Sequence, residues 1–342
     1  MMKLGFYSDN VAPASPDFVR AITIANEGYE ASYGDDIWTA RLQTTAQHVF
    51  ERTESVAAFP VLNGKAANHL SLLAATEPGG IVFCHECAHL MVDENDGPQR
   101  YTQASFIGLK DNGAGKITPE TLRQAIADAG DISCRSVFCL TNVTERGTVY
   151  TVAEITELAA IAHDADLTVH LDGARIANAA VALNASLADL TWKAGVDIVS
   201  MGLTKNGGLS AEAVVIFDDL TASRFIEARA WTGHVPSKMR FLSVQAVIGL
   251  DGRDWKLRAR NANEMAKLLA EGLGALDGVD ILQPVEANLI FVDLSSERRA
   301  KFDAAGYVAE SRPDLGPNVI RLVTNWCTLE SDIRQLLAVL AD

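Results

Sequence analysis

The chain has 342 residues, of which 48% are hydrophobic and 21% charged, a composition typical of a globular protein with a sizeable core. The net charge of −15 disfavours phosphate backbones and anionic lipid surfaces, so we expect neither nucleic acid nor membrane as a partner. No apolar stretch approaches the ~20 residues that cross a bilayer, and the N-terminus lacks the apolar segment of a signal peptide. Five cysteines do not form a disulfide framework, which predicts a cytoplasmic protein with reduced thiols.

Short apolar runs alternate with segments of helical period along the first two thirds of the chain. Thr118 before Pro119 marks one helix start, and Thr151 with Glu154 forms a capping box at another. Strands that are apolar throughout and separated by helices indicate a parallel sheet covered on both faces. We expect strands at 55–62, 81–84, 136–140, 167–171, 197–201 and 213–217, and helices at 66–75, 117–128 and 151–165.

The pattern changes after about residue 242. One long helix is expected over 246–273, followed by short strands at 280–282, 289–294 and 319–324 with helices between them. We therefore divide the chain into a large α/β domain, residues 1–241, and a small C-terminal α+β domain, residues 242–342.

Ligands of parallel α/β sheets bind at the carboxyl ends of the strands, which directs attention to Gly64, Asp172, Arg175 and Lys205. Gly64 lies between a strand and a helix, where free backbone N–H groups form an anion site, although an ordinary strand-to-helix turn has the same pattern. Asp172 ends a buried strand and needs a cationic partner. That partner is either a pyridinium nitrogen or Arg175, unless the carboxylate caps a helix.

Lys205 follows an apolar strand, where partial burial lowers the pKa of an amine and suits it to Schiff-base chemistry; the alternative is a surface lysine. It lies one strand–helix unit after Asp172, so both side chains emerge at the same edge of the sheet. An anion site at Gly64, an acid for a ring nitrogen and an amine for an aldehyde together fit pyridoxal 5′-phosphate (PLP).

An amino-acid substrate presents a carboxylate, which Arg175 and Arg321 can clamp. Arg321 lies in an apolar strand, where an internal salt bridge is the alternative. His89 can stack on a cofactor ring or transfer a proton near pH 7, or it is a structural histidine. Cys84 and Cys87 resemble half a zinc site, but no second pair with similar spacing follows, so we expect no metal.

Over nearly its whole length the chain resembles the low-specificity L-threonine aldolases, PLP enzymes of the aspartate-aminotransferase fold (fold type I). The resemblance rests on short segments in a fixed order: Ser8-Asp9-Asn10, Tyr33-Gly34-Asp35-Asp36, Asn63-Gly64 with Ala67-Asn68, Ala88-His89 with Glu94, Asp172-Gly173-Ala174-Arg175, Thr204-Lys205, Ser237-Lys238-Met239-Arg240 and Arg321-Leu322-Val323-Thr324.

The resemblance implies a large domain with a mostly parallel seven-stranded sheet and cleavage of L-threonine, L-allo-threonine or related β-hydroxy-α-amino acids to glycine and an aldehyde such as acetaldehyde. It also implies a homotetramer built from dimers, with active sites at the dimer interface. The resemblance implies that Lys205 forms the Schiff base, that Asp172 pairs with the pyridine nitrogen, and that His89 stacks on the ring and accepts a proton. It implies phosphate contacts for Gly64 and Lys65, cofactor contact for Arg175, and contact with a neighbouring subunit's phosphate for Arg240. The substrate carboxylate is expected to be bound by Ser8, Arg175 and Arg321.

Three positions depart from the family pattern. Lys65 stands where the phosphate loop usually has Thr, so it either contacts phosphate by charge or points away. Val143-Thr144-Glu145 replaces a Thr-His-Asn segment, which leaves a second active-site histidine without a candidate there, and Asn206 replaces a Gly after the lysine. A β-eliminating lyase or an aminotransferase of the same fold is the alternative enzyme, and a PLP-fold binding module without catalysis is the alternative outside enzymes.

Overall fold

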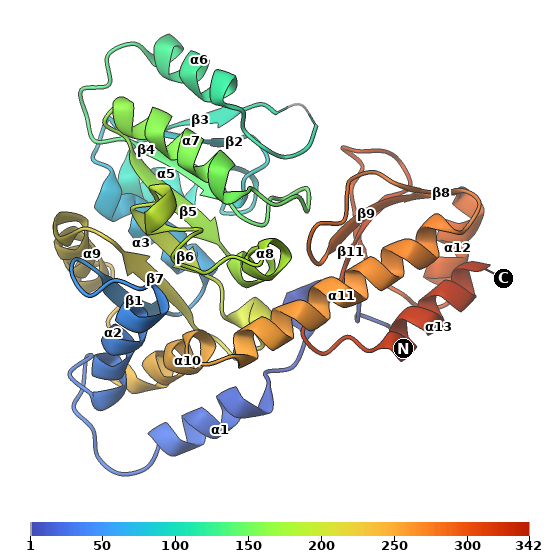
Figure 1. Cartoon of the computed structure of the whole chain (residues 1–342), viewed down its shortest axis with the longest axis horizontal. Coiled ribbons are helices and arrows are strands. Elements are labelled where there is room, and N and C mark those ends of the chain that lie inside the picture. The colour runs from blue at the N-terminus through green and yellow to red at the C-terminus, as the bar shows by residue number, and fades with distance from the viewer. Residues whose placement is uncertain (1, 112, 342) are drawn as a thin grey trace.

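The computed structural model describes residues 2–111 and 113–341. Figure 1 shows helices packed around two separate sheets, with the long helix α11 (Asp254–Gly274) running from one to the other. None of the helices in these two ranges combines the length and the apolar character that a membrane crossing needs.

The larger sheet has the strand order β1-β7-β6-β5-β4-β2-β3. Neighbouring strands pair in parallel except at β7, which is antiparallel to β1 and β6. The connection from β6 to β7, residues 202–211, is too short for the helical crossover that a parallel neighbour requires. The predicted mostly parallel seven-stranded sheet is confirmed. Its strands are β1 (Ala57–Val61), β2 (Ile81–His85), β3 (Ser105–Leu109), β4 (Val137–Thr141), β5 (Thr168–Gly173), β6 (Ile198–Met201) and β7 (Glu212–Ile216).

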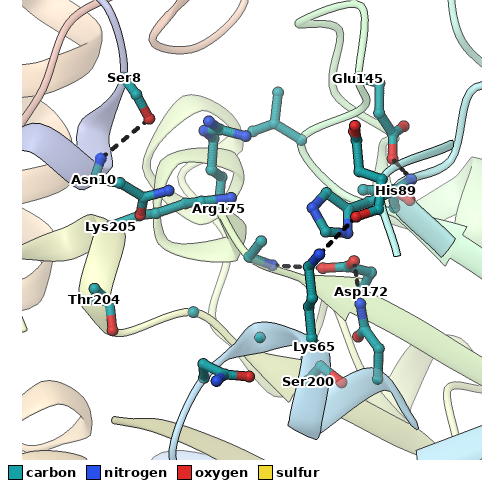
Figure 2. A pocket seen from close by; sticks show the side chains of 18 of the residues that line it. Ser8, Asn10, Lys65, His89, Glu145, Asp172, Arg175, Ser200, Thr204 and Lys205 are labelled. Atoms are coloured by element: carbon teal, nitrogen blue, oxygen red, sulfur yellow. Dashed lines mark hydrogen bonds between the residues drawn. The ribbon is translucent and has the colours of Figure 1, made fainter. Parts of the chain in front are cut away.

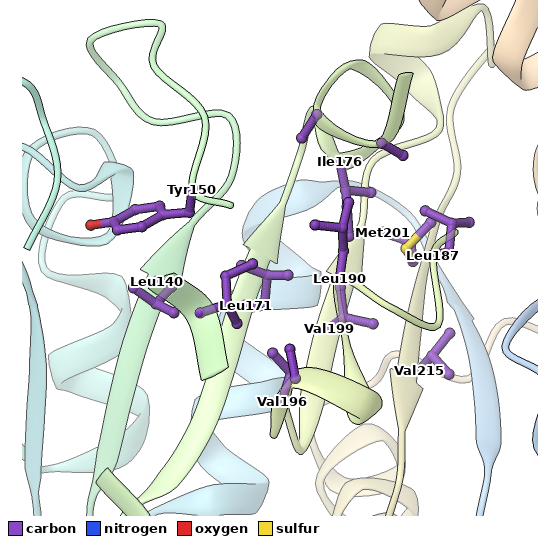
Figure 3. Close-up of a cluster of buried hydrophobic side chains, with 14 of the residues drawn as sticks. Leu140, Tyr150, Leu171, Ile176, Leu187, Leu190, Val196, Val199, Met201 and Val215 are labelled. Atoms are coloured by element: carbon purple, nitrogen blue, oxygen red, sulfur yellow. The ribbon is translucent and has the colours of Figure 1, made fainter. Parts of the chain in front are cut away.

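Both faces of this sheet are covered because adjacent residues of a strand point to opposite sides. Leu140 and Val199 belong to the cluster on one face, part of which Figure 3 shows, and Cys139 and Ile198 belong to the cluster on the other. The first face packs against α2 (Ile37–Val49), α6 (Pro119–Ala129), α7 (Val152–Asp164), α8 (Ile176–Leu183) and α10 (Arg240–Leu250), and the second against α3 (Gly64–Ala75) and α9 (Asp219–Trp231).

Two predicted helix starts are confirmed. The Thr118 side chain accepts a hydrogen bond from the backbone of Thr121, with Pro119 in the first turn, and Thr151 and Glu154 form the reciprocal capping box. The remaining helices of this part are α1 (Pro16–Ala25), α4 (His89–Val92), α5 (Gly97–Thr102) and the 3-10 turns η1 (Asp9–Val11), η2 (Trp192–Ala194) and η3 (Thr204–Asn206).

The single helix predicted over 246–273 is wrong, because α10 and α11 are separate helices. Gly252 lies between them with a φ of +76°, a left-handed conformation that favours glycine and ends α10. The division predicted between residues 241 and 242 lies inside α10 and stays a prediction. Val247 of α10, which that division assigns to the small domain, packs in the core of the large sheet. Phe6, which it assigns to the large domain, packs with the small sheet.

The small sheet is antiparallel and has the order β10-β11-β9-β8. Three strands were predicted, and the two-residue β10 was not, because it is too short for a periodic signal. The elements are β8 (Val279–Ile281), β9 (Leu289–Leu294), β10 (Glu310–Ser311), β11 (Val319–Val323), α12 (Ser296–Ala304) and α13 (Glu330–Ala341).

Candidate active site

A cavity of about 990 Å³ opens at the carboxyl ends of the parallel strands. The large sheet supplies one wall, and residues of β10 and β11 supply part of the other. Figure 2 shows how side chains from the N-terminal segment and from the large sheet converge on it. Of the predicted site residues, Ser8, Gly64, Lys65, His89, Asp172, Arg175, Lys205 and Arg321 line the cavity.

Lys205 lies in η3, directly after β6, and its ε-amine makes no hydrogen bond or ion pair with the residues that the structure describes. The turn is held by Glu212, whose carboxylate accepts hydrogen bonds from the backbone N–H groups of Leu203 and Thr204. Burial, and then the positive charge of Arg175, hold the pKa of Lys205 below its ordinary value. The amine therefore has a larger uncharged fraction than a surface lysine, which favours its use as a nucleophile.

Asp172 is the penultimate residue of β5, with 5% of its surface exposed. One carboxylate oxygen accepts a hydrogen bond from Asn68 Nδ2 at 2.8 Å, and the other accepts one from Ala174 N at 3.0 Å. Both alternatives from the sequence are wrong. Arg175 is paired elsewhere, and α8 has its N-cap at Arg175. Among the described residues Asp172 forms no ion pair, and its buried carboxyl group lines the cavity.

His89 begins the short helix α4, and its Nδ1 lies 2.7 Å from Oε1 of the fully buried Glu94. Burial works to lower the pKa of His89, but the hydrogen bond and charge of Glu94 outweigh it and hold that pKa above its usual value. Because Nδ1 faces a carboxylate, the neutral ring carries its proton there, which leaves Nε2 as the acceptor.

The phosphate-binding segment predicted at Gly64 is the first turn of α3. The Asn63 side chain caps this helix by accepting from Ala66 N at 2.9 Å, and open space surrounds the α carbon of Gly64. Free N–H groups at such a helix start favour an anion. Lys65 Nζ donates to the backbone oxygen of Asp93 at 2.6 Å, so its charge is held across the mouth of the cavity.

Arg175 donates two hydrogen bonds to Asp9, from Nε at 2.9 Å and from Nη2 at 2.7 Å. Burial alone would raise the pKa of Asp9, but Arg175 lowers it to about 2. Asn288, which precedes β9, also donates to Asp9 at 2.9 Å, so this carboxylate joins the two halves of the cavity wall. Ser8 lies beside this pair and accepts a hydrogen bond from Asn10 N at 3.2 Å.

Arg321 lies on β11, and its Nη2 is 2.5 Å from a carboxylate oxygen of Glu310 on β10. The salt bridge considered from the sequence is therefore present, and the guanidinium still lines the cavity. Its buried Nε has no hydrogen-bond partner among the described residues. Burial, and then the charge of Arg175, lower the pKa of Arg321, which indicates two guanidinium groups sharing one pocket.

Arg240 begins α10 and does not line the cavity of this chain. Its guanidinium lies over the ring of Phe241, with Cζ 5.1 Å from the ring centroid. Its predicted contact with a neighbouring subunit stays a prediction.

Glu145 lines the cavity and was not chosen from the sequence, although the segment that contains it was noted as a departure. Its Oε1 accepts a hydrogen bond from the backbone N–H of His89 at 3.1 Å. Burial, and then the charge of Asp172, raise the pKa of Glu145 above its ordinary value. A carboxyl in place of an expected Thr-His-Asn segment, at the end of a central strand, is the signal that could have identified it.

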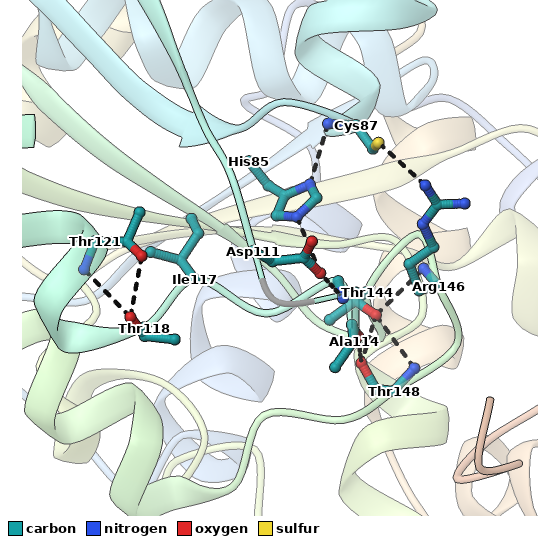
Figure 4. A network of polar contacts seen from close by, with 12 residues as sticks. His85, Cys87, Asp111, Ala114, Ile117, Thr118, Thr121, Thr144, Arg146 and Thr148 are labelled. Atoms are coloured by element: carbon teal, nitrogen blue, oxygen red, sulfur yellow. Dashed lines mark hydrogen bonds and ion pairs between the residues drawn. The ribbon is translucent and has the colours of Figure 1, made fainter. Parts of the chain in front are cut away.

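The cysteine segment considered as half a zinc site is part of a polar network at the edge of the cavity (Figure 4). Cys87 Sγ lies 3.7 Å from Arg146 Nη2, and His85 Nδ1 accepts a hydrogen bond from Cys87 N at 3.0 Å. Within residues 2–111 and 113–341, no cluster of three or more His, Cys, Asp or Glu side chains has the arrangement of a metal site.

A model of the beta-eliminating lyase family matches residues 5–297. The low-specificity L-threonine aldolase of Pseudomonas aeruginosa is 37% identical over 333 residues, which cover 97% of this chain and 95% of that protein. The chain belongs to the low-specificity L-threonine aldolase family. A second relative of this description, from a Pseudomonas strain, is 35% identical over 335 residues and covers 97% of this chain and 96% of its own length. Threonine aldolases are lyases, so the predicted enzyme class is confirmed.

Solved structures agree with the family in fold. A structure of Leishmania major threonine aldolase has a TM-score of 0.90 at 22% identity and covers 99% of this chain and 98% of its own. A Sphingomonas wittichii serine palmitoyltransferase has a TM-score of 0.74 at 14% identity and covers 99% and 86%. The predicted fold type I architecture is confirmed.

Proposed function

We propose that the protein cleaves L-threonine, L-allo-threonine and related β-hydroxy-α-amino acids into glycine and an aldehyde, acetaldehyde in the case of threonine, with PLP as cofactor. The observation that carries this proposal is one cavity that joins the free amine of Lys205 with the unpaired acid Asp172 in a member of the threonine aldolase family.

The residues of the cavity fit PLP. Asp172 is a buried carboxylate that would pair with a protonated ring nitrogen, and Lys205 is an amine suited to an aldehyde. Gly64 and Lys65 begin α3, whose first N–H groups would bind the phosphate, and His89 would stack on the ring. When bound, PLP would supply an electron sink for the bond that breaks at the α carbon of the substrate.

The substrate carboxylate would be held by Ser8, Arg175 and Arg321. Arg175 is already oriented by Asp9, and the buried Nε of Arg321 has no hydrogen-bond partner within residues 2–111 and 113–341. Two guanidinium groups on one carboxylate limit the rotation of the substrate about its N–Cα bond. Positioning of this kind can contribute several kcal/mol to a reaction, ~7–11 in well-oriented cases.

His89 would accept the proton of the β-hydroxyl group at Nε2, because Glu94 holds the other ring nitrogen. The proton is then available for return to the α carbon, so the cleavage needs no other co-reactant. Because the pKa of His89 is raised, its accepting form increases only as the pH rises through a value above the ordinary one. Replacement by asparagine, His89→Asn, should therefore lower turnover more than cofactor binding. Unchanged turnover would assign the proton transfer to water or to another group.

One experiment separates this function from elimination and transamination. The purified protein is incubated with PLP and L-threonine, and acetaldehyde, glycine and ammonia are measured while the absorbance spectrum of the cofactor is followed. Aldol cleavage gives acetaldehyde and glycine in equal amounts, whereas β-elimination releases ammonia. Ammonia without acetaldehyde would move the assignment to a β-eliminating lyase, and transfer of the amino group to a keto acid would move it to an aminotransferase.

The assembly is part of the proposal. Arg240 lies at the start of a helix outside the cavity of its own chain, which is compatible with contact to a phosphate held by a second subunit. We propose a cytoplasmic homotetramer made of two dimers, each with its active sites at the interface. Light scattering, together with the cofactor affinity of Arg240→Ala, tests this arrangement. A monomer with unchanged affinity would contradict it.

A further inference from the structure

Two histidines share the buried carboxylate of Glu94. Oε1 lies 2.7 Å from His89 Nδ1 at the cavity wall, and Oε2 lies 2.6 Å from Nε2 of His69 on α3. The Glu94 side chain has no exposed surface, and its pKa is lowered to about 2 because the contacts with His69 and His89 outweigh the opposing effect of burial. An ionised carboxylate therefore lies between two imidazoles.

Asn68 connects this array to the acid at the end of β5. Its side-chain nitrogen donates to Glu94 Oε1 at 3.1 Å and to Asp172 Oδ2 at 2.8 Å. Asn68 and His69 are consecutive residues of α3, so one turn of helix fixes both oxygens of Glu94. The orientation of the His89 ring thus depends on a carboxylate that has little freedom to move.

The neighbours of His69 keep its ring against Glu94. The ring lies 5.4 Å from that of Tyr101, and only 14% of the side chain is exposed. Gly97 begins α5 beside the ring, and a Cβ added there would lie 2.5 Å from Cε1 of His69. The close approach of α5 to the imidazole requires glycine at this position.

We propose that His69 is a positioning residue of the reaction, acting through Glu94 to set the tautomer and the proton affinity of His89. The role of His69 in the reaction rests on the proposed function. The effect of His69 on the proton affinity of His89 does not depend on that function. No other described residue forms an ion pair or hydrogen bond with the second oxygen of Glu94, so His69 competes, together with Asn68 on the first oxygen, with His89 for this carboxylate.

Other charged groups face this array and are unchanged when only His69 is altered. Asp172 and Lys205 lie near His89 with opposite effects on its pKa, and Glu145 accepts the hydrogen bond of its backbone N–H. On the side of His69, the ionisable neighbours are Tyr101 and His234. Burial, and then the charge of the nearby Arg229, lower the pKa of His234.

The direction of the effect is the same for either charge state of His69. If His69 is neutral, its removal takes a polar ring nitrogen from its place 2.6 Å from Glu94 Oε2, and the carboxylate attracts the proton of His89 more strongly. If His69 is protonated, its removal takes a positive charge from the array. In both cases the pKa of His89 rises.

Histidine-labelled full-length protein, with and without PLP, is titrated by NMR, and the His89 signal is identified by its loss in His89→Asn. We expect His69→Ala to raise the pKa of His89 by about half a unit or more, a threefold tighter binding of the proton. The acidic limb of kcat/KM for threonine should move to higher pH by the same amount, whereas kcat on the alkaline plateau should change less than about threefold.

A second variant tests the same contact without removing the imidazole. In Gly97→Ala the new methyl group would displace the ring of His69 from Glu94, so the pKa of His89 should again rise. The matched controls are His48→Ala, an exposed histidine on α2, and Gly274→Ala, where a Cβ meets no neighbour; neither should move the His89 signal.

Two results would overturn the inference: a His89 pKa that is unchanged within the error of the titration in both folded variants, or one that falls. Thermal unfolding checks that the variants are folded. If His69→Ala does not fold, the titration of Gly97→Ala alone tests the inference. A protein without aldolase activity that still shows the shift would remove the proposed function and leave the coupling of His69 to His89 intact.

Discussion

The two walls of the cavity hold their charged groups in different ways. At the carboxyl edge of the large sheet, Asp172 is buried and Lys205 is partly buried, and neither has an ion-pair partner among the described residues. At the small sheet, Arg321 and Arg312 are paired with Glu310 and Asp314, and those two acids are 39% and 47% exposed.

The difference separates two tasks. Groups that are buried without a counter-charge are strongly influenced by any partner that enters, which suits bond-breaking chemistry on a cofactor. Groups that are already paired at a partly exposed rim exchange one carboxylate for another at low cost, which suits recognition of a substrate. Substitutions on the first wall should therefore reduce turnover, and those on the second should mainly change KM.

The largest effect is expected for Lys205→Ala. Without the amine, the visible absorbance band of the bound cofactor should be lost and turnover should fall on the order of a thousandfold or more. Absorbance spectra and acetaldehyde release measure both. Lys267→Ala, at an exposed pair on α11, is the control. A purified Lys205→Ala protein that keeps the band would remove Lys205 from this role.

Asp172→Asn comes next. Both oxygens of Asp172 accept hydrogen bonds, from Asn68 and Ala174, and an asparagine can satisfy only one of them while also losing the charge. We expect turnover to fall roughly a hundredfold with the cofactor still bound, as measured by acetaldehyde release and by cofactor titration. If turnover stays within threefold of the native value, the negative charge of Asp172 is not needed for the reaction.

On the other wall, Arg321→Ala should raise KM for threonine about tenfold or more and change kcat only a few-fold, because a carboxylate contact is lost in the ground state and transition state alike. Glu310→Gln sharpens the test. It frees Arg321 from its ion pair and should leave KM unchanged or lower. Steady-state kinetics give KM and kcat for threonine in both variants. An unchanged KM in Arg321→Ala would mean that the substrate carboxylate is held by other residues.

A smaller effect is expected for Glu145→Gln. Glutamine keeps the shape of the side chain and offers an amide oxygen that can still accept the hydrogen bond from His89 N, so kcat should change less than about tenfold. Measurement of kcat against pH shows whether Glu145 takes part in proton transfer. A fall on the order of a hundredfold would instead make Glu145 the proton acceptor of the β-hydroxyl group.

The smallest effect is expected for Asp314→Asn at the rim, where Asp314 lies 3.1 Å from Arg146 and 2.9 Å from Arg312. Arg312 lowers the pKa of Asp314 to about 2, so its stabilisation is present above the ordinary value near 3.8 and is lost as the pH falls through 2. Because these groups are partly exposed, we expect a loss of less than ~1 kcal/mol at pH 7. Urea unfolding at pH 7 and pH 2 measures it, and a difference that persists at pH 2 would contradict this origin.

Local sequence was sufficient for the framework of the site. The capping box of Thr151 and Glu154 and the start at Thr118 depend on residues three apart, and apolar runs with a period of two or 3.6 mark elements without knowledge of the fold. Asp172 and Lys205 could be placed at one edge because parallel strands end together. The break at Gly252 was missed because glycine also occurs inside helices and its φ is not visible in the sequence, and the reversal of β7 was missed because strand direction is set by pairing in space.

By itself, then, the sequence determined most of the strands, the fold class and most of the residues that meet at the strand ends, because these follow from hydrophobic period and from short motifs. Only the tertiary structure decided the partners: Arg175 with Asp9, Arg321 with Glu310, and Glu94 between His69 and His89. Ion pairs and hydrogen bonds act over a few ångströms, and Arg175 meets Asp9 only after folding has brought distant segments of the chain together.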